Sequence, residues 1–321
     1  MLERHNKDIY TKIVKDGVKM ELRVLRYFLH IAREGSITRA ADLLHVTQPT
    51  LSRQIKDLEL ELGKKLFIRS SHNIILTEEG RLLRKRVEEI VHMVEKLEAE
   101  FTSMEETISG DVYIGSGETD TMRQIAEVVK DIQLQYSNIR YHLYSGNEED
   151  VSDRLDRGLL DFGLLIEPAD LSKYNYINIP TKDVWGVILR KDSPLAVKRT
   201  IQAADLFNVP LICSRQAIKQ TYSKNVFADW FGEDFDKLNV VTTYNLAYNA
   251  AIMVDEGIGY AITLDKIVNT SNESNLCFRP LEPQLESGLN IVWKKQQVFS
   301  AAAEVFLRGI QARFSNPISE K

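Results

Sequence analysis

The chain has 321 residues, 44% hydrophobic and 27% charged, which excludes an intrinsically disordered protein and leaves room for two or three globular domains. No apolar run reaches the ~18 residues that a membrane-spanning helix needs, and the two cysteines stand in no metal-ligand spacing, so we expect a cytoplasmic protein without a membrane partner. Residues 1–77 carry 14 Lys/Arg against 9 Asp/Glu, whereas residues 78–321 carry 27 against 37, and this basic start fits either DNA phosphates or chance variation in surface charge.

Two short helices are expected after a polar extension over residues 1–19. Apolar residues recur at helical spacing over residues 22–34, and Gly35 interrupts that pattern. Ser36 or Thr38 can then cap a second helix, because a hydroxyl accepts a hydrogen bond from the free N–H groups at a helix start.

A third helix is expected between Thr47, which can cap it, and Gly63, where it stops. Its inner positions are apolar, whereas its outer face offers hydrogen-bonding or cationic groups near the start. Pro49 is tolerated in the first turn of this helix. The outer residues are Gln48, Thr50, Ser52, Arg53, Gln54 and Lys56. The second and third helices, with such groups on the third, form a helix-turn-helix that fits the major groove of double-stranded DNA. A generic three-helix bundle with a solvated polar face is the alternative.

Residues 66–77 predict a two-stranded wing, because β-prone segments flank a polar turn, and Arg69 in it could reach a phosphate or the minor groove. The next helix, from Thr77 to about Glu106, carries the clearest periodicity of the chain. Apolar residues recur there at alternating steps of four and three, at Leu83, Val87, Ile90, Val94, Leu97 and Phe101. Such a seam pairs with a second copy of itself, so we expect a homodimer. A long helix packed on its own globular body is the alternative.

From Asp111 onward short strands alternate with helices, which predicts βαβ units and a mostly parallel sheet. Two sets of such units imply two lobes with a cleft between them. The expected division is an extension over 1–19, a winged helix-turn-helix domain over 20–77, a long helix over 78–109 and a two-lobed α/β domain over 110–321, with lobe I at about 110–180 and 276–321 and lobe II at about 181–275.

Residues 20–80 resemble the DNA-binding domain of LysR-type transcriptional regulators. The resemblance rests on Gly35-Ser36, Ala40-Ala41 and the segment TQPTLSRQIKDLELELGKKLF. Further along, LDRGLLDFGLLI, GVILRKDSPLA and VDEGIGYAI resemble landmarks of the family's effector domain. The fold class implied is α/β: an N-terminal winged helix-turn-helix, a long dimerising linker helix and a C-terminal two-lobed α/β effector domain similar to periplasmic binding proteins.

The resemblance also implies partners and sites. It assigns DNA contacts to the third helix and to Arg69, with Thr38 and Thr47 beside them. It implies an effector pocket at strand ends and helix starts, where free N–H groups suit an anion. The residues implied there are Ser116, Thr119, Ser145, Asn147, Glu167, Ser214, Arg215, Gln216 and Tyr244. The implied partners are double-stranded DNA, a small carboxylate or amino-acid-like effector, and further copies of the chain in a homodimer that assembles into a homotetramer.

The chain departs from the family pattern at three positions. His72 stands where a second wing arginine is common, which weakens the expected phosphate contact or makes it dependent on pH. Glu79 replaces the small residue usual before Gly80, and Ser137 stands where the family often has a proline. Four acidic residues near the implied pocket weaken the case for an anionic effector, and these are Glu118, Asp120, Glu148 and Glu167.

Two other functions compete with regulation. An enzyme is the first, but the α/β part contains no GxSxG elbow, P-loop or GxGxxG after a strand, and its single histidine is His142. We therefore expect no catalytic residue, no cofactor and no metal. An architectural DNA-bending protein without a ligand is the second, and DNA binding that never changes with any metabolite would favour it.

Overall fold

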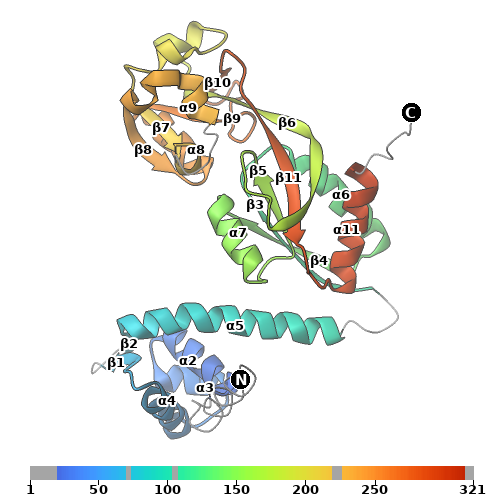
Figure 1. Cartoon of the computed structure of the whole chain (residues 1–321). Coiled ribbons are helices and arrows are strands. Elements are labelled where there is room, and N and C mark those ends of the chain that lie inside the picture. Colours follow the sequence, from blue (N-terminus) through green and yellow to red (C-terminus); the bar gives the residue numbers. More distant parts are fainter. Residues whose placement is uncertain (1–19, 70–73, 103–107, 219–225, 315–321) are drawn as a thin grey trace, which may run out of the picture. The chain divides into compact units, whose positions relative to one another are not determined.

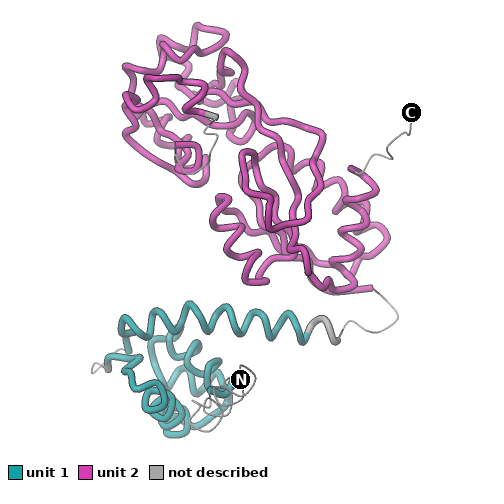
Figure 2. The backbone as a smooth tube through the Cα atoms, viewed as in Figure 1, with its two compact units in different colours: residues 1–98 teal, residues 99–321 magenta. Residues whose placement is uncertain are grey.

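The computed structural model describes residues 20–69, 74–102, 108–218 and 226–314, so the predicted extension over residues 1–19 and His72 lie outside the described residues. The chain divides into two compact units, residues 1–98 and residues 99–321 (Figure 2).

The first unit is a winged helix-turn-helix followed by one long helix (Figure 1). Its elements are α2 (Leu22–Glu34), α3 (Ile37–Leu43), α4 (Gln48–Leu62), β1 (Phe67–Arg69), β2 (Ile74–Leu76) and α5 (Glu78–Thr102). The three helices, the wing and the long helix predicted from the sequence are therefore confirmed.

Helix ends in this unit follow from local chemistry. Gly35 ends α2 with a φ of 60°, a left-handed conformation that favours glycine, and Ser36 caps α3 by accepting a hydrogen bond from the Arg39 N–H at 3.4 Å. Thr47 occupies the cap position of α4, but the cap hydrogen bond expected from its side chain is absent. Its hydroxyl instead lies 2.8 Å from the hydroxyl of Thr50.

The second unit is a mixed α/β domain. Its strands are β3 (Gly110–Ser116), β4 (Ile139–Ser145), β5 (Phe162–Ile166), β6 (Tyr174–Arg190), β7 (Leu211–Ser214), β8 (Val240–Tyr244), β9 (Tyr260–Leu264), β10 (Leu276–Pro280) and β11 (Glu286–Lys294). Its helices are α6 (Met122–Gln135), α7 (Glu148–Asp156), α8 (Arg215–Ile218), α9 (Val226–Phe231), α10 (Ala247–Asp255) and α11 (Ala301–Phe314), with short 3-10 turns at Pro194–Val197, Ala203–Asp205 and Gly232–Lys237.

The strand order is β4-β3-β5-β11-β6-β9-β7-β8, with β10 beside β6. Pairings of β3 with β4 and β5, and of β7 with β8 and β9, are parallel, whereas every pairing of β6, β10 and β11 is antiparallel. The expected mostly parallel sheet is thus corrected to a mixed one. The reason is that β6 and β11 run between two lobes, each of which contains parallel strand pairs, as Figure 1 shows.

The long strand β6 defines the lobes. Its first half pairs with β11 in lobe I, and its second half pairs with β9 and β10 in lobe II. Residues 276–280 therefore lie in lobe II, not in lobe I as expected, because β10 pairs with residues 186–190 of β6. The return to lobe I is made by β11 instead.

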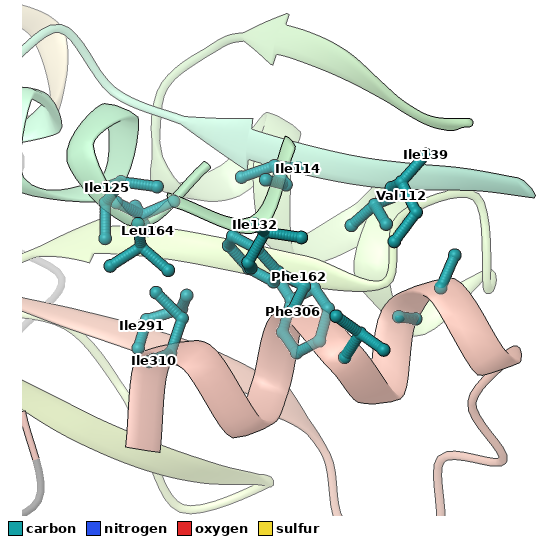
Figure 3. Packing of buried hydrophobic residues seen from close by; sticks show 14 of the residues in the cluster. Val112, Ile114, Ile125, Ile132, Ile139, Phe162, Leu164, Ile291, Phe306 and Ile310 are labelled. Carbon is teal, nitrogen blue, oxygen red and sulfur yellow. The ribbon is translucent and has the colours of Figure 1, made fainter. Parts of the chain in front are cut away.

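Lobe I has an apolar core between its sheet and the helices α6 and α11, which pack against each other. Phe162 of β5 is fully buried there and lies in edge-on contact with Phe306 of α11, with ring centroids 4.9 Å apart. Figure 3 shows the aliphatic side chains that surround this pair, among them Val112, Ile114, Ile125, Ile132 and Ile291. This core fixes the strand ends that face the cleft.

Candidate DNA-binding surface and effector cavity

The start of α4 presents a polar surface to solvent. Its inner residues Leu51, Ile55 and Leu58 are buried in the core of the first unit. The predicted DNA-contacting residues lie on the other side, with Thr47, Gln48, Pro49, Thr50, Arg53 and Lys56 exposed, Ser52 and Gln54 half-buried, and Thr38 exposed on α3. One face of α4 thus packs in the core, and the opposite face carries polar side chains, as in a helix that reads a DNA groove.

Arg53 is available for a DNA partner. Its side chain is 83% exposed, and its contact with Asp57 joins Nε to Oδ2 at 3.9 Å. Such an exposed pair contributes at most about 1 kcal/mol, so a base edge or a phosphate can replace it.

A buried carboxylate positions the wing against α4. Glu59 is 6% exposed, and its Oε1 accepts hydrogen bonds from the main-chain N–H groups of Leu66 and Phe67 at 2.8 and 3.3 Å. Lys65 donates to its other oxygen at 2.9 Å. Burial alone would raise the pKa of Glu59, but Lys65 and the two N–H groups together hold it below its ordinary value. Sequence reasoning missed this residue, which stands among other charged residues of the same helix.

The wing itself is the antiparallel pair β1 and β2, with Phe67 opposite Leu76. The backbone of Arg69 ends β1, as predicted, while its side chain lies outside the described residues.

The apolar seam predicted on α5 divides between two faces. Val87 is 1% exposed in the core of the first unit, and Leu83 packs against the same core. Val94 is half-buried, and the side chain of Phe101 lies outside the described residues. The seam is therefore corrected, because its first turns are used by the domain that carries them.

A different stripe of α5 remains exposed. It consists of Leu82, Ile90, Met93 and Leu97, which are 63%, 37%, 44% and 51% exposed. At 100° per residue these four positions fall within about 80° of one another around the helix. We call them the α5 stripe, and two of its members, Ile90 and Leu97, belong to the predicted seam.

A cavity lies in the cleft between the lobes of the second unit. Of the predicted effector residues, Asn147, Glu167, Ser214, Gln216 and Tyr244 line it. Its volume, counted as positions open to the centre of a water molecule, is about 90 Å³. On that measure one water needs about 10–15 Å³, so the cavity has room for a small organic molecule.

The other predicted effector residues lie elsewhere. Ser116, Thr119 and Ser145 line a neighbouring, more open hollow, together with Lys266. Arg215 is exposed at the start of α8 and lines neither of these hollows. The residues predicted to form one effector pocket are therefore divided between two neighbouring hollows.

Thr119 is engaged by the protein itself. Its hydroxyl donates to the carboxylate of Asp183 and accepts from the Thr121 N–H, while the Thr121 hydroxyl donates to the other Asp183 oxygen at 3.0 Å. Asp183 is 4% exposed on β6, where that strand passes between the lobes. Burial raises the pKa of Asp183, and the two threonines oppose this rise. The Thr119 hydroxyl thus already has two hydrogen-bond partners within the protein, one of them on β6 where that strand passes between the lobes.

Two contacts cross the cleft between the lobes. Gln216 of lobe II donates from Nε2 to the Glu148 carboxylate at 3.0 Å, and its amide oxygen accepts from the Glu148 N–H at 3.3 Å. In the second contact, the carboxylate of Glu118 in lobe I accepts a hydrogen bond from the Ala247 N–H at the start of α10 in lobe II. These contacts join residues that a ligand in the cavity would also touch, since all of them line it.

Aromatic side chains form part of the cavity wall. Trp185 and Phe227 meet edge to face, with ring centroids 4.7 Å apart, and the Trp185 indole N–H donates to the Ser287 hydroxyl at 2.7 Å. The Tyr244 hydroxyl donates to the main-chain oxygen of Ile262 at 2.7 Å, and burial raises its pKa well above the ordinary range. The aromatic wall is therefore uncharged, and hydrogen bonds hold Trp185 and Tyr244 in place.

Within the described ranges, no helix is long and apolar enough to cross a membrane. Among the same residues, no cluster of three or more His, Cys, Asp or Glu side chains is arranged to hold a metal ion.

A winged helix-turn-helix with an exposed polar second helix, on a chain that also has a two-lobed domain with a cleft cavity, defines the class of ligand-responsive DNA-binding regulators. Comparison with known proteins makes this class specific. Residues 22–81 match the bacterial regulatory helix-turn-helix proteins of the lysR family, and residues 105–315 match the LysR substrate binding domain. The chain belongs to the LysR family of transcription regulators, and it is a DNA-binding regulator with an effector-binding domain.

Relatives and solved structures agree with this assignment. An uncharacterized HTH-type transcriptional regulator of Bacillus subtilis, YvbU, is 28% identical over 90% of this chain and 97% of its own length. The Hca operon transcriptional activator HcaR of Escherichia coli is 28% identical over 92% of this chain and 99% of its own. The crystal structure of full-length CbnR complexed with its target DNA has a TM-score of 0.70 at 17% identity, covering 92% of this chain and 100% of CbnR, and shows the same fold.

Proposed function

We propose that the chain binds double-stranded DNA as a homodimer, with α4 in the major groove, and that a small molecule in the cleft cavity changes this binding. The observation that carries the DNA-binding part is the division of α4 into a buried apolar side and an exposed polar side at its start. In this proposal Gln48 and Arg53 read base edges, and the hydroxyls of Thr50 and Ser52 hold phosphates. The CbnR complex supports the proposal by showing that a chain of this fold binds DNA.

Replacing Arg53 or Gln48 by alanine is expected to weaken binding to a sequence-selected duplex by about 10- to 100-fold, because one base contact is worth about 1–3 kcal/mol. The measurement is fluorescence anisotropy with the full chain, on the selected duplex and on a shuffled duplex of the same composition. Arg33→Ala, at an exposed arginine of α2, is the matched control and should change affinity little. Equal loss on both duplexes would contradict a base-reading role for these residues.

The dimer part of the proposal rests on the α5 stripe. Four apolar side chains, exposed on one side of a helix of 25 residues, favour burial against a second copy. We further propose that effector domains join two dimers into a tetramer, which is the arrangement that the family resemblance implies.

The regulatory part rests on the contacts across the cleft. A ligand can shift DNA binding only if it binds two states of the protein unequally. The Glu118–Ala247 and Glu148–Gln216 contacts offer such a difference, because a ligand between the lobes would strengthen or replace them. We propose no catalytic role for the cavity, which makes the chain a regulator and not an enzyme, and we place its action in the cytoplasm with its DNA.

A further inference from the structure

We propose that the cleft cavity selects a small organic cation, an amine or guanidine with an apolar part, in place of the small carboxylate expected from the resemblance. This inference rests on the proposed function, because it takes the cavity as the effector site. Three features of the cavity carry it: the charge of its wall, the use of its helix N-termini, and its aromatic side.

The wall is acidic. Among the described residues that line the cavity, three are glutamates, Glu118, Glu148 and Glu167, and none is Lys, Arg or His. Glu118 accepts from a main-chain N–H, and Glu167 accepts from the Asn290 amide at 2.9 Å, so the donors to both are neutral. Among the described residues no cationic side chain pairs with either carboxylate, and at Glu118 the N-terminus of α10 offsets only part of the charge. Both carboxylates therefore keep a negative charge that a ligand cation would compensate.

The position of Glu167 is built into the fold. A Cβ atom on Gly288 would lie 2.7 Å from one Glu167 carboxylate oxygen, so the absence of a side chain there makes room for the acid. The Glu167 N–H also donates to the Gly288 oxygen at 2.9 Å. The carboxylate is thus held at the cavity by β11 and does not have to be ordered by the ligand.

At the starts of α7 and α10, which border the cavity, N–H groups that would attract an anion already have acceptors within the protein. The Ala247 N–H at the start of α10 donates to Glu118, and the Glu148 N–H at the start of α7 donates to the Gln216 amide oxygen. Asn147 caps α7 by accepting from the Asp150 N–H at 2.9 Å. An anionic ligand would have to displace Glu118 from α10, and it would face the charge of Glu118 and Glu167 after doing so.

The remaining wall suits the apolar part of such a ligand and attracts its charge. Trp185, Phe227 and Tyr244 contribute aromatic rings, and Leu164, Ile166 and Leu264 contribute aliphatic groups. Aromatic faces attract ammonium and guanidinium groups, most strongly where water is excluded. An amphiphilic cation therefore matches both halves of the cavity, whereas a carboxylate matches only the apolar half.

The test uses the full chain and two matched sets of probes. The aromatic set is 2-phenylethylamine, 2-phenylethanol and phenylacetate, and the aliphatic set is 3-methylbutylamine, 3-methylbutanol and 3-methylbutanoate. Melting is followed by tryptophan fluorescence, which reports the second unit because all three tryptophans, Trp185, Trp230 and Trp293, lie in it. A ligand that binds only the folded state raises the melting temperature. We expect at least one amine to raise it more than its alcohol, and no carboxylate to do so.

Variants then locate the binding. Glu118→Gln and Glu167→Gln keep a side-chain oxygen that can accept the Ala247 and Asn290 hydrogen bonds, so both variants are expected to fold. Each should weaken binding of the amine that stabilises the protein by about 10-fold, the size expected for one hydrogen bond to a charged group. Glu304→Gln, at an exposed acid of α11, is the control and should leave amine affinity unchanged.

Every outcome decides the proposal. A carboxylate that stabilises more than its amine would overturn the cationic class, yet leave the effector-modulated regulator standing. Absence of stabilisation by either amine, or unchanged amine affinity in both glutamine variants, would also overturn it. Binding of the selected duplex, measured separately with the Arg53→Ala variant, tests the DNA-binding function independently of all these results.

Discussion

Leu97→Asp is expected to convert the dimer to a monomer and to lower affinity for a two-half-site duplex by about 10²- to 10⁴-fold, because the loss of a second linked DNA-binding head removes avidity. Leu97 is half exposed in the α5 stripe, so an aspartate there does not enter the core of its own domain. It would instead place a charge in the apolar interface between copies. Sedimentation velocity gives the mass, and anisotropy gives the affinity.

The matched control is Leu60→Asp, the same change at a leucine of α4 that is 78% exposed and lies off the stripe. It should leave the sedimenting mass unchanged. Val87→Asp is the contrasting variant, because Val87 is buried in its own domain and its replacement should unfold that domain. A Leu97→Asp protein that sediments with the wild-type mass would refute the dimer through the α5 stripe.

Glu59→Ala is expected to lower the free energy needed to open the base of the wing by about 2–6 kcal/mol. The reason is that the change leaves two buried main-chain N–H groups without an acceptor, which costs about 1–3 kcal/mol for each group. Those N–H groups belong to Leu66 and Phe67, which lead into β1. Amide hydrogen exchange of peptides covering residues 59–69, measured by mass spectrometry in the full chain, reports this opening directly. Glu61→Ala, at an exposed glutamate of the same helix, should leave exchange unchanged.

The pH dependence of this effect has a definite sign. The folded pKa of Glu59 lies below its ordinary value of 4.5, so the contribution of the carboxylate to stability is fully present above pH 4.5. It is lost as the pH falls through the lowered pKa and the acid becomes protonated in the folded state. Stabilisation by Glu59 that grows as the pH falls below 4.5 would contradict this account.

Most of the fold follows from patterns that local chemistry controls. The helical spacing of residues 22–34, the polar face of α4 and the alternation of strands and helices after Asp111 depend on periodicity and caps. The first half of β6, residues 174–183, does not follow from such patterns, because its polar residues and Pro180 are typical of a loop. Its strand is made by pairing with β11, more than a hundred residues later in the chain.

The candidate site was predicted less completely. Residue types and strand ends located the cleft, and five of the predicted residues line its cavity. The role of Thr119 was not foreseeable, because its partner Asp183 comes from a strand segment that the sequence pattern did not reveal. The same holds for the α5 seam, since a heptad pattern does not tell whether Val87 packs against a second copy or against its own domain.

Selection of binding sites from a pool of random duplexes by the full chain tests whether this protein is a dimeric, sequence-reading regulator that uses α4. We expect enrichment of a sequence with two symmetric half-sites, spaced by about one turn of DNA or a multiple of it, roughly 10–10.5 base pairs per turn. The Arg53→Ala variant should lose this enrichment. Recovery of no common sequence, or of the same sequence by the Arg53→Ala variant, would show that α4 of a dimer does not read DNA sequence in this way.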